Sequence, residues 1–94
     1  MSKSIMSNEK KCFMCGALDV HKHHIFHTTA NRVVSERNGC WIYLCPKHHN
    51  FDSEYGIHFN TPFDETMKKF CQYVWEEQGH TRDEFIKTFG KSYL

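Results

Sequence analysis

Metal-binding side chains are concentrated in the middle of this chain, and their spacing constrains the fold more than any other feature. The 94 residues include five cysteines and eight histidines, and seven of the histidines lie between residues 21 and 58. Cys12-x-x-Cys15 and Cys45-x-x-His48 form two pairs, each able to bind one ion from a single turn. Because Zn²⁺ prefers four nitrogen or sulfur ligands in a tetrahedron, the two pairs predict one structural Cys3His zinc site.

The small size of the chain explains why such an ion would matter. A domain of this length buries a small core, which a bound metal can stabilise. The other cysteines, Cys40 and Cys71, have no partner at ligand spacing, and we expect both in the core. The odd cysteine count and the lack of an apolar signal region in residues 1–11 indicate a reducing, cytoplasmic environment.

Composition excludes several classes of protein. Twelve Lys and Arg against eleven Asp and Glu give a net charge of +1, so a strongly basic DNA-coating protein is excluded. The mean hydropathy is -0.66, and no apolar run approaches the length of a membrane span, so we expect no membrane association. Residues 1–11 are polar and predict a flexible arm, followed by a single domain over residues 12–94.

Local patterns predict the order of the elements in the first part of this domain. Residues 20–26 and 40–44 are rich in β-favouring side chains and predict two strands. The polar residues 28–39 between them predict a loop with room for one helical turn. Pro46 favours the start of a short helix directly after the second strand.

The last third of the chain predicts two amphipathic helices. The first is expected to begin with Thr61 as its cap and to end at Gly79. The second is expected to begin with a capping box formed by Thr81 and Glu84 and to end at Gly90. The residues expected to face the core share a three- and four-residue spacing: Phe63, Met67, Phe70, Cys71, Val74, Trp75, Phe85, Ile86 and Phe89.

Several histidines remain outside the predicted zinc site. His23 and His24 end the first predicted strand, and His49 directly follows the zinc ligand His48. Adjacent residues on a helix point about 100° apart, so His49 can face a second site while His48 faces the zinc. The following loop offers three more candidate ligands: Asp52, Glu54 and His58.

With these motifs, the chain resembles the HNH branch of the ββα-metal (His-Me finger) nucleases, above all small HNH-like proteins of phages and prophages. The resemblance covers most of residues 12–94 and is carried by the zinc pair Cys12/Cys15, His23-His24-Ile25-Phe26, Asn31-Arg32, Ser35, Gly39-Cys40-Trp41, Leu44-Cys45, His48-His49 and Gly56-Ile57-His58. It implies an α+β fold. A ββα-metal core over residues 12–60, with its Cys3His zinc, would be followed by a helical extension over residues 61–94.

The resemblance also implies a role for individual residues. His24 stands at the position of the general base, and Asn31 at the middle residue of the HNH motif, with Asn38 as an alternative. The implied ligands of a catalytic cation are His23, His49 and His58. That cation would be Mg²⁺ or Mn²⁺, with Ni²⁺ or Zn²⁺ in some members, and no small-molecule cofactor is expected.

Two arginines are candidates for contact with DNA. Arg32 and Arg37 lie in the segment that would border the catalytic site, and a net charge of +1 predicts few phosphate contacts and low sequence specificity. Aromatic residues such as Trp41 and Trp75 could stack on bases, but core packing is favoured for them. The flanking His21 and His27 are expected to be solvated.

These observations lead to two hypotheses from different classes. The first is a metal-dependent DNA endonuclease or nickase, encoded by a phage and acting in the bacterial cytoplasm. The second is an inactive, zinc-stabilised module of the same fold that binds nucleic acid or inhibits a host defence protein. A third hypothesis is an accessory of phage DNA packaging that acts with a partner protein.

Overall fold

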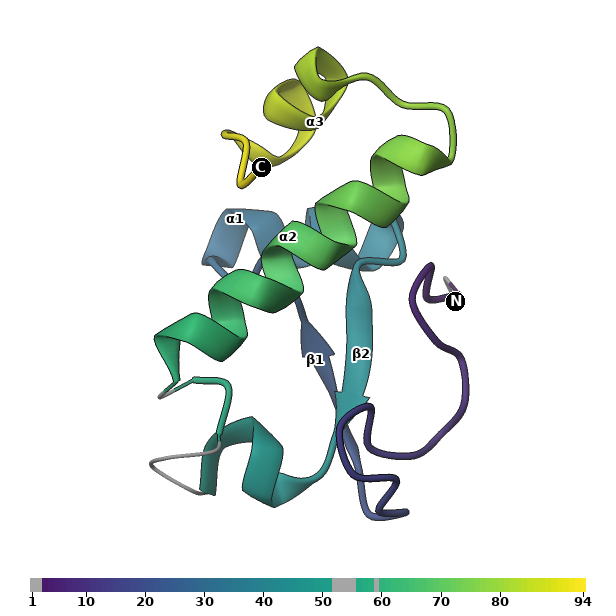
Figure 1. The fold of residues 1–94 in the computed structure, drawn as a ribbon, viewed down its shortest axis with the longest axis vertical. Coiled ribbons are helices and arrows are strands. Elements are labelled where there is room, and N and C mark those ends of the chain that lie inside the picture. Colours follow the sequence, from purple (N-terminus) through teal and green to yellow (C-terminus); the bar gives the residue numbers. More distant parts are fainter. Residues whose placement is uncertain (1–2, 52–55, 59) are drawn as a thin grey trace.

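A computed structural model of the chain describes residues 3–51, 56–58 and 60–94, and it has an α+β architecture (Figure 1). The elements follow in the order β1 (His21–His24), α1 (Thr29–Arg37), β2 (Trp41–Leu44), η1 (Lys47–Phe51, a π-helical turn), α2 (Thr61–Glu77) and α3 (Arg82–Phe89). None of the described helices is both long enough and apolar enough to cross a membrane. The order of elements agrees with the sequence prediction except at α1.

The two strands pair as an antiparallel sheet. His21 lies opposite Leu44, and His23 lies opposite Ile42. β2 consists of Trp, Ile, Tyr and Leu, which strongly favour a strand, whereas β1 is formed largely of histidine and depends on this pairing. Both strands are shorter than predicted, and β1 ends at His24. The histidine doublet therefore lies at the end of a strand, where the following chain can turn away.

The segment between the strands is a nine-residue helix, so the prediction of a loop over residues 28–39 was wrong. Thr28 caps α1, and its hydroxyl accepts a hydrogen bond from the backbone of Asn31. The buried hydroxyl of Ser35 accepts from the backbone N–H of Phe26 and donates to its carbonyl. This contact fixes α1 against the chain that leaves β1, and such long-range contacts outweigh weak local propensity.

The core forms where α2 and α3 meet the sheet. Figure 1 shows α2 running diagonally in front of the strands, with α3 beyond its C-terminal half. The buried apolar side chains of α2 and α3 share one core with β2; they are Met67, Cys71, Trp75, Phe85 and Phe89. The expected core residues Phe70 and Ile86 are 43% and 39% exposed, which corrects the predicted stripe. Trp41 and Trp75 are both buried, as expected.

The helix ends follow the sequence signals closely. The cap of α2 is Asn60, whose side chain accepts from the backbone of Phe63 at 3.0 Å, so the predicted cap Thr61 is the first helical residue. The capping box of Thr81 and Glu84 at the start of α3 is confirmed, with hydrogen bonds of 2.8 and 3.1 Å. The capping box and the side-chain caps satisfy backbone donors that have no partner within the helix.

The N-terminal segment packs along the free edge of β2, although the sequence predicted an arm with little to bury. The hydroxyl of Ser4 is buried and donates to the carbonyl of Trp41 at 2.6 Å. The backbone N–H of Ile5 donates to the carbonyl of Gly39 at 2.9 Å. Gly39 has a φ of +70°, and a Cβ there would lie 2.3 Å from the carbonyl oxygen of Lys3. Only glycine allows the segment to approach so closely.

Candidate metal centres

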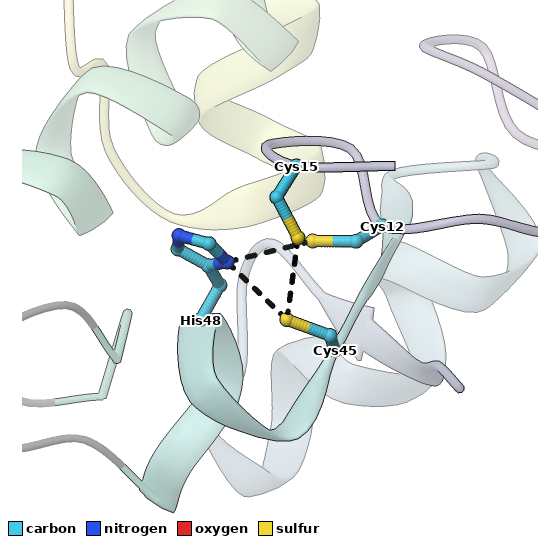
Figure 2. A group of neighbouring side chains, drawn as sticks. All are labelled: Cys12, Cys15, Cys45 and His48. Atoms are coloured by element: carbon cyan, nitrogen blue, oxygen red, sulfur yellow. Dashed lines mark hydrogen bonds between the residues drawn. The ribbon is translucent and has the colours of Figure 1, made fainter. Parts of the chain in front are cut away.

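The side chains of the two predicted zinc pairs converge at one end of the sheet. Figure 2 shows Cys12 and Cys15, on the N-terminal loop, facing Cys45 and His48 at the start of η1. The four ligand atoms all lie within 4.8 Å of one another. The Sγ atoms of Cys15 and Cys45 are 3.6 Å apart. Nδ1 of His48 lies 3.2 Å from Sγ of Cys45, and it lies 3.7 Å from Sγ of Cys12.

These separations fit a tetrahedral metal site. With Zn–S bonds of about 2.3 Å and Zn–N bonds of about 2.0 Å, tetrahedral ligands lie about 3.3–3.8 Å apart. The observed distances of 3.2 to 3.7 Å are close to that range. The Cys3His cluster can therefore hold a metal ion such as zinc, which would join the N-terminal loop to the end of β2.

Local backbone geometry brings the first pair of ligands together. Gly16 has a φ of +77°, and its N–H donates to the carbonyl of Cys12 at 2.8 Å, which closes the turn. The N–H of Phe13 donates to the carbonyl of Tyr43 at 2.8 Å, so the turn is attached to β2 beside the second pair. Burial acts to raise the pKa of Cys12, but backbone hydrogen bonds to its sulfur outweigh burial and lower that pKa to about 6. The thiolate form that a metal needs is thus favoured.

A second cluster contains three of the four histidines to which the resemblance gave catalytic roles. The ligand atoms of His23, His49 and His58 lie within 4.8 Å of one another. The Nε2 atoms of His49 and His58 are 3.1 Å apart, near the edge length of about 3.3 Å in a tetrahedral site with nitrogen ligands. The ring of His23 lies 5.3 Å from the ring of His49 and 5.1 Å from that of His58.

A strand, a helical turn and a loop position these imidazoles. His23 projects from β1 toward the interior and is 2% exposed. His49 follows His48 in η1, so the two side chains serve different clusters, as the sequence predicted. Ile57 is buried and donates its N–H to the carbonyl of His48, and His58 donates its N–H to the carbonyl of His49. These backbone hydrogen bonds place His58 next to His49.

All three imidazoles of this cluster are held in the neutral state. Burial and the neighbouring histidines lower the pKa of His23 to about 2 and that of His49 to about 4. Burial and the nearby His27 also lower the pKa of His58. Nε2 of His23 is buried and has no hydrogen-bond partner among the described residues. The neutral imidazole is the form in which histidine binds metals.

The cluster lies in a hollow of about 370 Å³ with basic residues around it. Besides the three histidines, the hollow is lined by Lys22, His24, His27 and Arg32. His27 was expected to be solvated, but its Nε2 lies 3.2 Å from a carboxylate oxygen of Asp64, which also pairs with Lys68. The hollow can accept an anion, since positively charged side chains and neutral imidazoles surround it.

His24 lines this hollow but is not one of the three clustered ligands. Its Nε2 lies 2.9 Å from Oε1 of Glu36 on α1. Lys22 reaches the same carboxylate, with its Nζ at 3.1 Å from Oε1 and 3.2 Å from Oε2. Sequence reasoning missed Glu36, because its segment was predicted as a loop. Arg32 and Glu36 are four residues apart, which places them on one face of a helix, and this spacing was the sequence signal for α1.

The other predicted site residues have separate positions. The side-chain amide of Asn31 donates to the carbonyl of Phe89 at 2.9 Å, outside the hollow. Asn38, the alternative, donates to the carbonyl of Val34 and accepts from Trp75. Arg37 is exposed and lines a neighbouring depression that also includes His24 and Arg32. The alternative ligands Asp52 and Glu54 lie outside the described residues.

The two cysteines without a ligand partner are core residues, as expected. Cys40 and Cys71 are both 0% exposed. A hydrogen bond with Cys40, together with burial, raises the pKa of Cys71, so that thiol stays protonated.

Comparison with known proteins gives no match: no family model, no curated protein and no solved structure matches this chain.

Proposed function

We propose that the protein is a divalent-metal-dependent phosphodiesterase of the HNH type that cleaves or nicks DNA. The Cys3His cluster would hold a structural zinc ion, and His23, His49 and His58 would hold a second, catalytic cation. The single observation that carries the proposal is the second cluster, with three neutral imidazoles in an open hollow next to a fourth histidine. A phage origin and a bacterial cytoplasmic location belong to the proposal through the sequence resemblance alone.

The donor set of the second cluster favours a transition metal. Three imidazole nitrogens suit Zn²⁺, Ni²⁺ or Co²⁺, whereas Mg²⁺ and Mn²⁺ prefer carboxylate oxygens and water. The described part of the cluster contributes histidines only. We therefore place Ni²⁺ and Zn²⁺ ahead of Mn²⁺ and Mg²⁺ as the working cation.

The residues around the hollow suit the hydrolysis of a phosphodiester. A divalent cation at this site would supply Lewis acidity, stabilising negative charge on the phosphate and on the leaving oxygen. Arg32 and Lys22 would bind the phosphate and orient it. Nε2 of His24 is engaged with Glu36, so Nδ1 is the nitrogen that would take a proton from the attacking water.

DNA is favoured as the substrate because the hollow is open and basic. The net charge of the whole chain is only +1. Such a surface would bind a polyanion weakly and with strong salt dependence. The exposed Arg37 extends the basic rim beyond the hollow along α1. A binding module without activity, which acts on nucleic acid or on a packaging or defence protein, is the alternative outcome of the test below.

The test is nicking of supercoiled plasmid with Mn²⁺, Ni²⁺, Zn²⁺ or Mg²⁺, using wild-type protein, His24→Ala and His49→Ala. We expect nicking by the wild type, and a loss of at least about a hundredfold in both variants. Arg82→Ala is the control, because Arg82 pairs with Glu76 and neither residue lines the hollow. Wild-type protein that nicks with none of these cations would exclude the nuclease and leave the binding module.

A further inference from the structure

We infer that Glu36 is a positioning residue for His24: its carboxylate holds the proton on Nε2 and fixes the ring so that Nδ1 can act as the base. The inference rests on the proposed function, and it adds a residue that the resemblance did not provide. It is drawn from the contacts between β1 and α1.

The geometry joins three side chains in one arrangement. Oε1 of Glu36 lies 2.9 Å from Nε2 of His24 and 3.1 Å from Nζ of Lys22. Nζ of Lys22 also lies 3.2 Å from Oε2 and 4.3 Å from the centre of the Trp41 ring. Lys22 is thereby held between the carboxylate and the aromatic ring. Both oxygens of Glu36 have a cationic partner, which keeps the carboxylate ionised and oriented.

An ionised carboxylate selects one form of the neighbouring imidazole. Because a carboxylate only accepts hydrogen bonds, the atom that faces it, Nε2 of His24, must carry a proton. In a neutral imidazole the lone pair then belongs to Nδ1. Catalytic histidines are commonly oriented by a third group in this way. Without Glu36, the ring of His24 could rotate, and both of its tautomers would be populated.

The position of the pair agrees with this role. His24 lines the hollow next to the three candidate cation ligands, whereas Glu36 does not line it. Glu36 lines the neighbouring depression together with His24, Arg32 and Arg37. The carboxylate thus contacts His24 from outside the hollow, where it would not repel a phosphate bound beside Arg32.

The kinetic test uses a double-mutant cycle of Glu36→Ala and His24→Ala in the plasmid-nicking assay with Ni²⁺. We expect Glu36→Ala to lower kcat about 10- to 100-fold with KM changed less than about threefold. The double variant should be no slower than His24→Ala, since Glu36 acts only through His24. Glu36→Gln should recover part of the loss, because its amide oxygen can still accept from Nε2. The control is Glu77→Gln, at the exposed C-terminal end of α2.

A second readout does not depend on activity. Proton–nitrogen NMR of the zinc-loaded protein should show a slowly exchanging proton on Nε2 of His24, and Glu36→Ala should remove that signal while Glu77→Gln keeps it. Absence of the signal in the wild type, or a Glu36→Ala variant with unchanged kcat, would overturn the inference. A wild-type protein that is inactive with every cation would overturn the proposed function and the catalytic role of Glu36 together.

Discussion

The side-chain amide of Asn31 donates to the backbone carbonyl of Phe89 at 2.9 Å, and this bond joins α1 to the last turn of α3. The last carbonyls of a helix have no partner within the helix, so Asn31 satisfies a group that would otherwise need water. Asn31 stands at the middle position of the HNH-like motif, yet its described contact holds the helical extension against the core. We therefore expect its contribution to be to stability.

Replacing Asn31 tests this role. Asn31→Ala should lower the free energy of unfolding by about 1 kcal/mol, the usual value of one side-chain hydrogen bond. Urea denaturation followed by tryptophan fluorescence measures the change, because Trp75 packs on the rings of Phe85 and Phe89 in the same region. The rate of plasmid nicking should stay within about threefold of wild type. Unchanged stability with a large loss of nicking would return Asn31 to the catalytic set.

Replacing a ligand of the Cys3His cluster should release the structural ion. Cys45→Ser is expected to lose one equivalent of zinc and to lower the Tm by at least about 10 °C, since a structural metal contributes several kcal/mol of stability. Elemental analysis and thermal unfolding measure these changes. Cys71→Ala is the matched control: it removes a buried thiol outside the cluster and should keep the zinc. Full zinc content in Cys45→Ser would contradict the assignment.

The N-terminal segment should contribute measurably to stability. Ser4→Ala removes the hydroxyl that donates to Trp41 and accepts from the backbone of Met6 and Ser7, and we expect a loss of about 1–2 kcal/mol in urea denaturation. Ser7→Ala is the control, because the hydroxyl of Ser7 lies near the surface and accepts a long hydrogen bond of 3.4 Å from the backbone N–H of Glu9. Equal stability of the two variants would support the original expectation of a flexible arm.

Cation binding at the second cluster should depend little on mild acid. Protons compete with a metal only below the pKa of the free imidazole, and that pKa is about 4 for His49 and about 2 for His23. The affinity for Ni²⁺ should therefore fall by less than about tenfold from pH 7.5 to 5.5. Three ordinary imidazoles with pKa values of about 6.5 would lose up to about a thousandfold. Calorimetric titration at both pH values, with His49→Ala as the non-binding control, decides between these outcomes.

The Cys3His cluster was predictable because the two ligands of each pair lie close together in the sequence. Each pair of ligands lies within one turn, and Gly16 supplies the positive φ that the first turn needs. The separation of His48 from His49 into two clusters likewise follows from helical geometry. The caps of α3 are similarly local, since Thr81 and Glu84 are three residues apart.

The contacts that determine α1 were not predictable from local pattern. The helix around Ser35 is held by hydrogen bonds between the Ser35 hydroxyl and the backbone of Phe26, and these are tertiary contacts. Glu36 acquires its place beside His24 only once that helix exists. The contact of His27 was also unpredictable from local pattern, since its partner Asp64 lies on α2, far away in the sequence. Hydrophobic spacing also overestimated the core at Phe70, since a periodic stripe does not define how wide the buried face is.

We propose that His23, His49 and His58 form a second cation site, separate from the Cys3His cluster. Native mass spectrometry of protein titrated with Zn²⁺ tests it most directly, with His49→Ala as the variant and His21→Ala as the matched control on the other side of the His49 ring. We predict two bound ions for the wild type and for His21→Ala, and one for His49→Ala. A single ion in the wild type, or two ions in His49→Ala, would contradict a second site at these histidines.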